Sequence, residues 1–173
     1  MRKRILLPLL IAVLMLALTA CGSGSAEKLD TAGAVTKAIA DNKLSGGELY
    51  SSQEIEGAYP FSEDLLVSYY GRGFDDYPDI SKVSEYTVWI NTDDPMHPME
   101  MGIFKLSDTA YADKLMEYID VRLGSVVENA KGYPSLDVRC YTDALKGTKE
   151  GYVWYIAVPD SASKIDKLFS NSL

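Results

Sequence analysis

The sequence has few of the residues that common catalytic and metal sites use: its 173 residues include one histidine and two cysteines. Two cysteines cannot form the disulfide framework of a small secreted domain or a cysteine-rich zinc site. The sequence also lacks a Gly-x-Ser-x-Gly nucleophile turn, a phosphate-binding glycine-rich loop and a His-Glu-x-x-His zinc motif. No motif therefore indicates a particular reaction or a bound cofactor.

Basic residues are scarce outside the first 20 positions. Residues 1–20 contain Arg2, Lys3 and Arg4 and no acid, so residues 21–173 carry 14 basic against 25 acidic side chains, a net charge of −11. Proteins bind nucleic acids and anionic lipid surfaces through clusters of lysine and arginine. The charge balance therefore argues against a nucleic-acid partner and against electrostatic docking on an anionic membrane.

The first 20 residues have the organisation of a secretory signal peptide. The basic residues 2–4 precede an apolar run over residues 5–18, which is shorter than the roughly 20 residues that a membrane-spanning helix needs. The segment Leu18-Thr19-Ala20-Cys21 resembles the lipobox of bacterial lipoproteins at all four positions. The alternative is an ordinary secretory peptide in which the cysteine is accidental.

The lipobox resemblance implies cleavage behind Ala20 and a diacylglyceryl group on the sulfur of Cys21. Two acyl chains anchor a protein stably, whereas a single chain gives marginal binding. The expected location is the outer face of the cytoplasmic membrane, or the outer membrane in a two-membrane bacterium. Residues 21–30 are rich in glycine, serine and alanine and predict a flexible tether, and residues 31–173 have the size of a single domain.

Cys140 is the one cysteine that such an anchor leaves over. Apolar and polar residues alternate over residues 136–143, which predicts a strand with Cys140 on its apolar side. An unpaired thiol in an exported protein can be reactive or pair between molecules. The alternation favours instead a buried cysteine that packs as a small hydrophobic residue.

Two helices are expected in the first half of the domain. Asp30 or Thr31 can cap the first, which is expected to end near Ser45-Gly46-Gly47. Ser62 can cap the second, which has Glu63 and Asp64 in its first turn and Gly71 at its end. Residues 48–60 show no period and predict an irregular segment, and residues 71–84 predict a connector.

A pattern of two strands and a helix follows and is repeated. The expected strands are residues 86–91, 99–106, 136–143 and 152–158, with a polar turn at 146–151. A long helix capped by Asp108 is expected to follow the second strand, and a final helix to begin at Asp160 or Ser161. This order predicts an α+β fold: a mainly antiparallel four-stranded sheet in a ββα-ββα arrangement, with helices on one face and the N-terminal helices at its edge or open face.

Four segments in the second part of the chain are distinctive. Residues 69–71, 84–88, 99–106 and 151–156 read Tyr-Tyr-Gly, Ser-Glu-Tyr-Thr-Val, Met-Glu-Met-Gly-Ile-Phe-Lys-Leu and Gly-Tyr-Val-Trp-Tyr-Ile. Through these segments, residues from about 65 to 173 resemble an uncharacterised bacterial lipoprotein family, catalogued as domain of unknown function 4358. The matching segments are packing patterns, and residues 93–98 are not part of them. The resemblance implies an exported lipoprotein without a known activity, and it supplies no catalytic residue.

Three methionines and the only histidine fall within six residues, 96–101. Thioether sulfur and imidazole nitrogen are ligands that Cu(I) selects, so Met96, His97 and Met99 are candidate metal ligands. Met99 and Met101 also begin a predicted strand, and Pro95 and Pro98 restrict how the ligands can converge. The other interpretation is a hairpin loop with ordinary apolar anchors.

Tyrosine is abundant, with 12 residues, and several lie in the first half of the domain. Aromatic side chains with a polar tip contact protein, peptide and glycan partners, or they cover a sheet as part of the core. The surface predicted for a partner consists of Tyr69, Tyr70, Tyr77 and Trp89. The sequence thus favours a lipid-anchored binding or interaction module, with two alternatives: a cell-wall or glycan-acting enzyme that uses a carboxylate pair, and a copper-binding protein.

Overall fold

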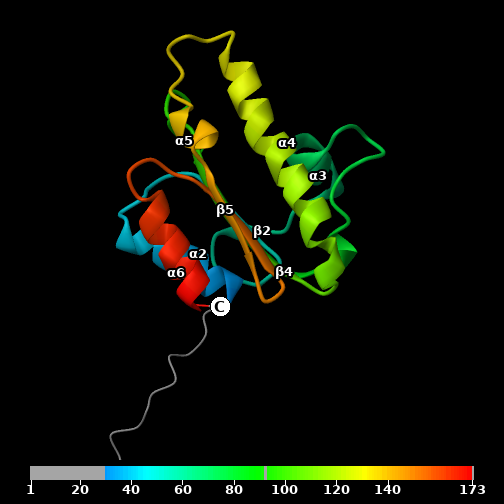
Figure 1. Ribbon diagram of the computed structural model, residues 1–173. Coiled ribbons are helices and arrows are strands. Elements are labelled where there is room, and N and C mark those ends of the chain that lie inside the picture. The colour runs from blue at the N-terminus through cyan, green and yellow to red at the C-terminus, as the bar shows by residue number, and fades with distance from the viewer. Residues whose placement is uncertain (1–29, 92, 173) are drawn as a thin grey trace, which may run out of the picture.

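A six-stranded mixed sheet forms the centre of the computed structural model, which describes residues 30–91 and 93–172. The strand order is β2-β1-β3-β4-β6-β5, and helices cover both faces of the sheet (Figure 1). Neighbouring strands are antiparallel except for β1 and β2, which are parallel. The predicted signal peptide, Cys21 and most of the predicted tether lie outside the described residues.

The strands are β1 (Glu48–Ser51), β2 (Ala58–Tyr59), β3 (Val83–Asn91), β4 (Met99–Leu106), β5 (Leu145–Lys149) and β6 (Tyr152–Ala157). The helices are α2 (Thr31–Asp41), α3 (Glu63–Tyr70), α4 (Ala112–Ala130), α5 (Arg139–Thr142) and α6 (Ala162–Ser172), with short 3₁₀ turns η1 (Ile80–Lys82) and η2 (Thr109–Tyr111). The predicted α+β class is therefore confirmed.

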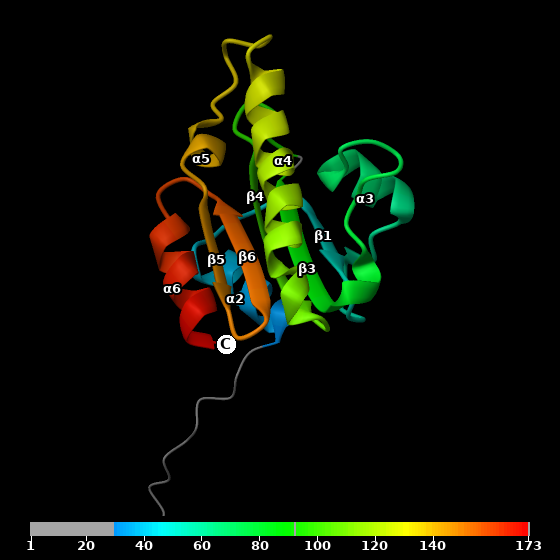
Figure 2. The same cartoon turned by 45° about the vertical axis from the view of Figure 1, so that its right-hand side comes forward.

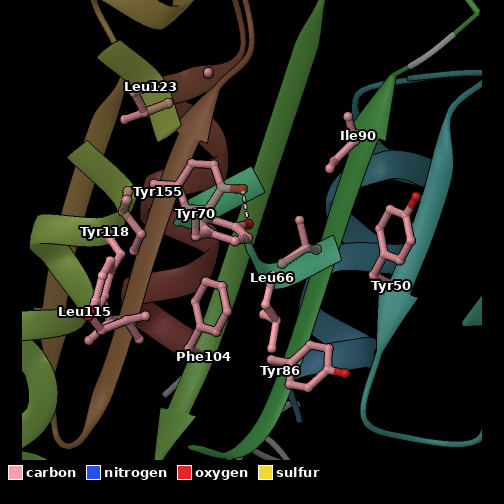
Figure 3. Packing of buried hydrophobic residues seen from close by; sticks show 14 of the residues in the cluster. Tyr50, Leu66, Tyr70, Tyr86, Ile90, Phe104, Leu115, Tyr118, Leu123 and Tyr155 are labelled. Atoms are coloured by element: carbon pink, nitrogen blue, oxygen red, sulfur yellow. Dashed lines mark hydrogen bonds between the residues drawn. The ribbon is translucent and has the colours of Figure 1, made fainter. Parts of the chain in front are cut away.

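The two helices that follow strand pairs, α4 and α6, lie on opposite faces of the sheet, not on one face as predicted, whereas α2 lies on the face opposite α4. α3 and α4 cover one face, where Tyr70, Phe104 and Tyr155 are buried (Figures 2 and 3). α2 and α6 cover the other face, where Trp89 and Trp154 are buried. The physical reason is that β3, β4 and β6 carry consecutive apolar residues, which point alternately to the two faces, so both faces need a cover.

The local helix signals in the sequence are confirmed. The Asp30 side chain accepts a hydrogen bond from the Gly33 amide at the start of α2, and Ser62 accepts one from Leu65 at the start of α3. Asp108 caps η2, which leads directly into α4. The apolar stripe of α4 faces the core, with Leu115, Ile119 and Leu123 buried.

Residues 136–143 do not form the predicted strand. They contain the short helix α5 instead. The strand of this region is β5, which lies a few residues later in the chain and overlaps the predicted polar turn at 146–151. β5 is an edge strand that pairs with β6 through its backbone, so it needs no apolar side chains. Gly147 permits this pairing, because a Cβ atom there would lie 2.2 Å from Cζ2 of Trp154. The turn itself is confined to Glu150 and Gly151, both with positive φ.

The segment 48–60, expected to be irregular, contributes β1 and β2. β1 pairs with β3 over four residues, which is too short for an alternation in the sequence to be recognised. Gly46 and Gly47, with φ of 74° and 80°, turn the chain from α2 into this strand. The sheet therefore has six strands where four were predicted.

A buried ion pair joins β4, α4 and α5. The Arg122 guanidinium donates to both carboxylate oxygens of Glu100, with Nη2 2.6 Å from Oε2 and Nε 3.1 Å from Oε1. The Glu100 side chain is fully buried and that of Arg122 is 15 % exposed. The Tyr141 hydroxyl donates to Glu100 Oε2 at 3.2 Å, and the Tyr69 ring lies 4.8 Å from the guanidinium carbon. Burial alone lowers the pKa of Arg122, but Glu100 more than offsets this and holds the pKa above its ordinary value.

Replacing Glu100→Gln is expected to lower the free energy of unfolding by about 3–5 kcal/mol, because Arg122 is left buried without a counter-ion. Urea denaturation measures this loss. The double variant Glu100→Leu/Arg122→Met is expected to lose less, since neither charge remains buried. Glu128→Gln, which breaks the exposed pair with Lys131 at the C-terminal end of α4, is the control and should cost less than about 1 kcal/mol. An equal loss in Glu100→Gln and Glu128→Gln would contradict the role of the buried pair.

Candidate functional site

A cavity of about 330 Å³ lies at the end of the sheet where β4 begins and β6 ends. Residues 97–99, 137–143 and 158–162 contribute to its wall, and we refer to it as the sheet-end cavity. Its volume is at the lower end of the range of small-molecule sites in proteins. The wall is partly apolar, through Met99, Val158 and Ala162, and partly charged.

Two hydrogen bonds hold the first two wall segments together, although about 40 residues separate them in the sequence. The Asp137 amide donates to the Met96 carbonyl at 3.0 Å, and the Cys140 thiol donates to the Pro98 carbonyl at 3.3 Å. The bond from Tyr141 to Glu100 fixes α5 to β4 on the neighbouring side. The segment before β4 is therefore aligned along the segment that leads into α5.

Acidic side chains dominate the charge of the cavity wall. Arg139 binds the Asp137 carboxylate with Nε at 2.9 Å from Oδ1 and Nη2 at 2.5 Å from Oδ2. These bonds lower the pKa of Asp137 to about 2 and raise that of Arg139. Asp143 and Asp160 also line the cavity and are exposed; neither forms a close ion pair with a described residue, although the charges of both add to the rise in the pKa of Arg139. With Asp137 neutralised by Arg139, the wall carries an excess of negative charge.

Asp160 lies at a sharp turn between β6 and α6. Its φ is 59°, in the left-handed region that side-chain-bearing residues seldom adopt. The turn, with Asp160 at its centre, is closed by a hydrogen bond from the Ser161 amide to the Pro159 carbonyl. The turn places the Asp160 carboxylate on the cavity wall.

His97 is oriented by a neighbouring carboxylate. Its Nδ1 lies 3.0 Å from Asp94 Oδ2, and the other carboxylate oxygen of Asp94 accepts from the Met96 amide. The hydrogen bond to His97 is the main cause that lowers the pKa of Asp94. Nε2 of His97 has no hydrogen-bond partner among the described residues. The imidazole therefore has one nitrogen engaged and one available.

The three methionines of this segment lie in different surroundings. Met99 is half-buried and lines the sheet-end cavity, whereas Met96 is 41 % exposed and is not part of its wall. Met101 is fully buried between the sheet and the helices α2 and α6. Of the candidate metal ligands predicted from the sequence, the structure thus places His97 and Met99 on one cavity wall and Met96 outside it.

Cys140 lines the same cavity, which its sequence pattern did not indicate. It lies in α5 and is half-buried, not fully buried on the apolar side of a strand. Burial is the main cause that raises the pKa of its thiol to about 11, and the nearby Asp137 carboxylate adds to this. A thiol with this pKa is protonated at neutral pH and is a poor nucleophile.

The predicted aromatic surface is not formed as one patch. Tyr70 is 1 % exposed and Trp89 is 2 % exposed, and they lie on opposite faces of the sheet. The Tyr70 hydroxyl is bonded to that of Tyr155 at 2.7 Å (Figure 3). Tyr69 is half-buried against Arg122, and the Tyr77 hydroxyl donates to Glu63. Tyr70 and Trp89 are therefore core residues, and only Tyr69 and Tyr77 retain exposed surface.

A second hollow, of about 480 Å³, lies beneath the connector between α3 and β3. Two of its acidic side chains are engaged within the chain: Tyr77 donates to Glu63, and Asp79 accepts from the amide and hydroxyl of Ser81. The sheet-end cavity differs in presenting a histidine nitrogen that has no hydrogen-bond partner among the described residues, together with a half-buried thiol. It is therefore the candidate functional site.

Most residues of this site could not be recognised from the sequence. Asp137, Arg139, Asp143 and Asp160 occur among many other charged residues and form no recognisable motif. An enzyme that uses a carboxylate pair needs one carboxyl group as a general acid. Asp137 cannot take this role, because Arg139 holds it ionised. Within residues 30–91 and 93–172, no three or more His, Cys, Asp or Glu side chains are grouped to hold a metal ion.

No family model matches the chain, and neither a curated protein nor a solved structure shows significant similarity to it. The resemblance to the lipoprotein family remains a prediction.

The Cys140 thiol is expected to react slowly with iodoacetamide. Its pKa is raised from 9.0 to about 11, so the thiolate fraction at pH 8 falls about 100-fold, and alkylation slows by at least this factor relative to the unfolded chain. Mass spectrometry of the Cys21→Ser chain, in which Cys140 is the only thiol, measures both rates with and without urea. Equal rates in the two states would contradict the protected thiol.

Proposed function

We propose that the chain is a lipid-anchored extracytoplasmic binding module that takes a small cationic ligand in the sheet-end cavity. The observation that carries this proposal is a cavity at one end of the sheet whose wall holds Asp143 and Asp160 without ion-pair partners among the described residues. Carboxylates on a concave, partly apolar surface attract cations. The net charge of −11 over residues 21–173 strengthens that attraction.

The direction in which the chain enters the domain supports an anchored module whose cavity faces the surrounding medium. Helix α2, the first described element, begins at the end of the sheet where α6 ends (Figure 2). Helix α5 and the start of α6, which contribute to the wall of the sheet-end cavity, lie at the other end of the sheet (Figure 2). A tether that enters from residue 30 would hold the cavity away from the membrane and open to the surrounding medium.

The anchor itself is proposed from the lipobox resemblance at Cys21. Among the described helices, none has the length and apolar character needed to cross a bilayer. The membership in the lipoprotein family suggested by residues 65–173 agrees with an acylated N-terminus.

Anchoring is tested by expressing the full chain in a bacterium supplied with radiolabelled palmitate. The chain is expected to take up the label and to partition into the detergent phase of Triton X-114, because the diacylglyceryl group adds about 0.8 kcal/mol per buried CH₂. Cys21→Ser should abolish both properties. Cys140→Ser, which removes the other cysteine, is the matched control and should retain both. Labelling that persists in Cys21→Ser would overturn the anchor.

The ligand class is tested with putrescine, in which four methylene groups separate two ammonium groups. In ¹⁵N NMR spectra of the Cys21→Ser chain in detergent micelles, putrescine is expected to shift the amide signals of the sheet-end cavity. The double variant Asp143→Asn/Asp160→Asn should weaken binding at least tenfold, since asparagine keeps the shape and tolerates the left-handed turn.

Two controls make this test specific. Butane-1,4-diol has the length of putrescine without its charges and should leave the cavity signals unmoved. Asp75→Asn/Asp79→Asn removes two carboxylates at the second hollow and should leave putrescine binding unchanged. The proposed ligand class is overturned if saturating putrescine moves no cavity signal or if the diol moves the same signals equally.

A further inference from the structure

We infer that the sheet-end cavity binds a soft monovalent metal ion of the Cu(I) type, with sulfur ligands from Cys140 and Met99 and a nitrogen ligand from His97. The inference rests on the proposed function, because it names the chemical class of the cation. It differs from the site suggested by the sequence, which consisted of the methionine-histidine segment alone.

The three proposed ligands line one cavity. Cys140 Sγ lies 3.3 Å from the carbonyl oxygen of Pro98, the residue between His97 and Met99. The thiol therefore lies beside the backbone of the segment that carries the imidazole and the thioether. Thiolate, thioether and imidazole are the ligand types that select Cu(I) over hard cations.

His97 is oriented in the way that is usual for a metal-binding histidine. Metal-binding histidines usually donate their second ring nitrogen to a carboxylate, which fixes the tautomer and aims the other nitrogen at the metal. Asp94 occupies that position at Nδ1, and the Met96 amide in turn fixes Asp94. Nε2 is left as the available lone pair.

The cavity wall is poorly suited to hard cations. A hard divalent cation such as Ca²⁺ needs six or more oxygen ligands, and the carboxylate three residues before Cys140, Asp137, is already bound by Arg139 at two oxygens. When Cu(I) binds, the Cys140 thiol releases its proton to solvent and the resulting thiolate neutralises the metal charge. Asp143 and Asp160 add a negative field that favours the entry of a cation.

The test is an anaerobic titration of the full chain with Cu(I), with ascorbate as reductant and bathocuproine disulfonate as the competing chelator. Cys21→Ser is present in every sample, so that Cys140 is the only thiol. One Cu(I) per chain is expected to be retained against the chelator. Cys140→Ser, Met99→Leu and His97→Ala should each weaken the apparent affinity at least tenfold.

Met116→Leu is the matched control, since Met116 lies in α4 outside the cavity wall, and it should leave Cu(I) retention unchanged. Circular dichroism checks that each variant is folded. X-ray absorption at the copper edge provides a readout that does not depend on variants and should show both sulfur and nitrogen ligands. Failure of the Cys21→Ser chain to retain Cu(I), or equal retention by Cys140→Ser, overturns the inference.

The experiments separate this inference from the proposed function. If putrescine moves the cavity signals and Cu(I) is not retained, the cavity binds cations but the soft-metal assignment is wrong. If Cu(I) is retained through Cys140 and putrescine does not bind, the metal site stands and the organic cation is excluded. If neither cation binds, both the cation site and the metal assignment are overturned.

Discussion

The buried ion pair between Glu100 and Arg122 is the interaction on which the rest of the structure depends. A carboxylate on an otherwise apolar sheet face must be paired, because an isolated buried charge costs several kcal/mol. Arg122 meets that need and thereby determines where α4 crosses β4. Tyr141 completes the pairing from α5 and thereby determines where the short helix lies. One carboxylate thus fixes three elements relative to one another.

The cavity follows from the same constraint because its residues are sequence neighbours of the network. Met99 precedes Glu100, and Cys140 precedes Tyr141, so the network that places Glu100 and Tyr141 also places the two sulfur atoms on the cavity wall. The hydrogen bond from Cys140 to Pro98 is a direct consequence of this arrangement. The same set of contacts therefore stabilises the core of the domain and shapes its candidate site.

Three successive residues of β4 pack in three different ways. Glu100 faces the α4 side, Met101 faces α2 and α6, and Gly102 allows close packing, because a Cβ atom there would lie 2.7 Å from the Tyr155 ring. Three residues of the segment 99–106, one of those that carry the family resemblance, thus have a packing explanation. Such a segment indicates how the sheet is covered and carries no information about a ligand.

The sequence by itself determined the features that depend on neighbouring residues: the caps at Asp30 and Ser62, the strand β4, the apolar stripe of α4 and the α+β class. It also indicated an export signal and a lipid attachment at Cys21, which remain predictions. Only the tertiary structure decided that β5 is a strand, that Tyr70 and Trp89 are core residues, and that Cys140, His97 and Met99 line one cavity. The physical reason is that caps and periodicity act over a few residues, whereas edge pairing, burial and cavity walls depend on segments that are far apart in the chain.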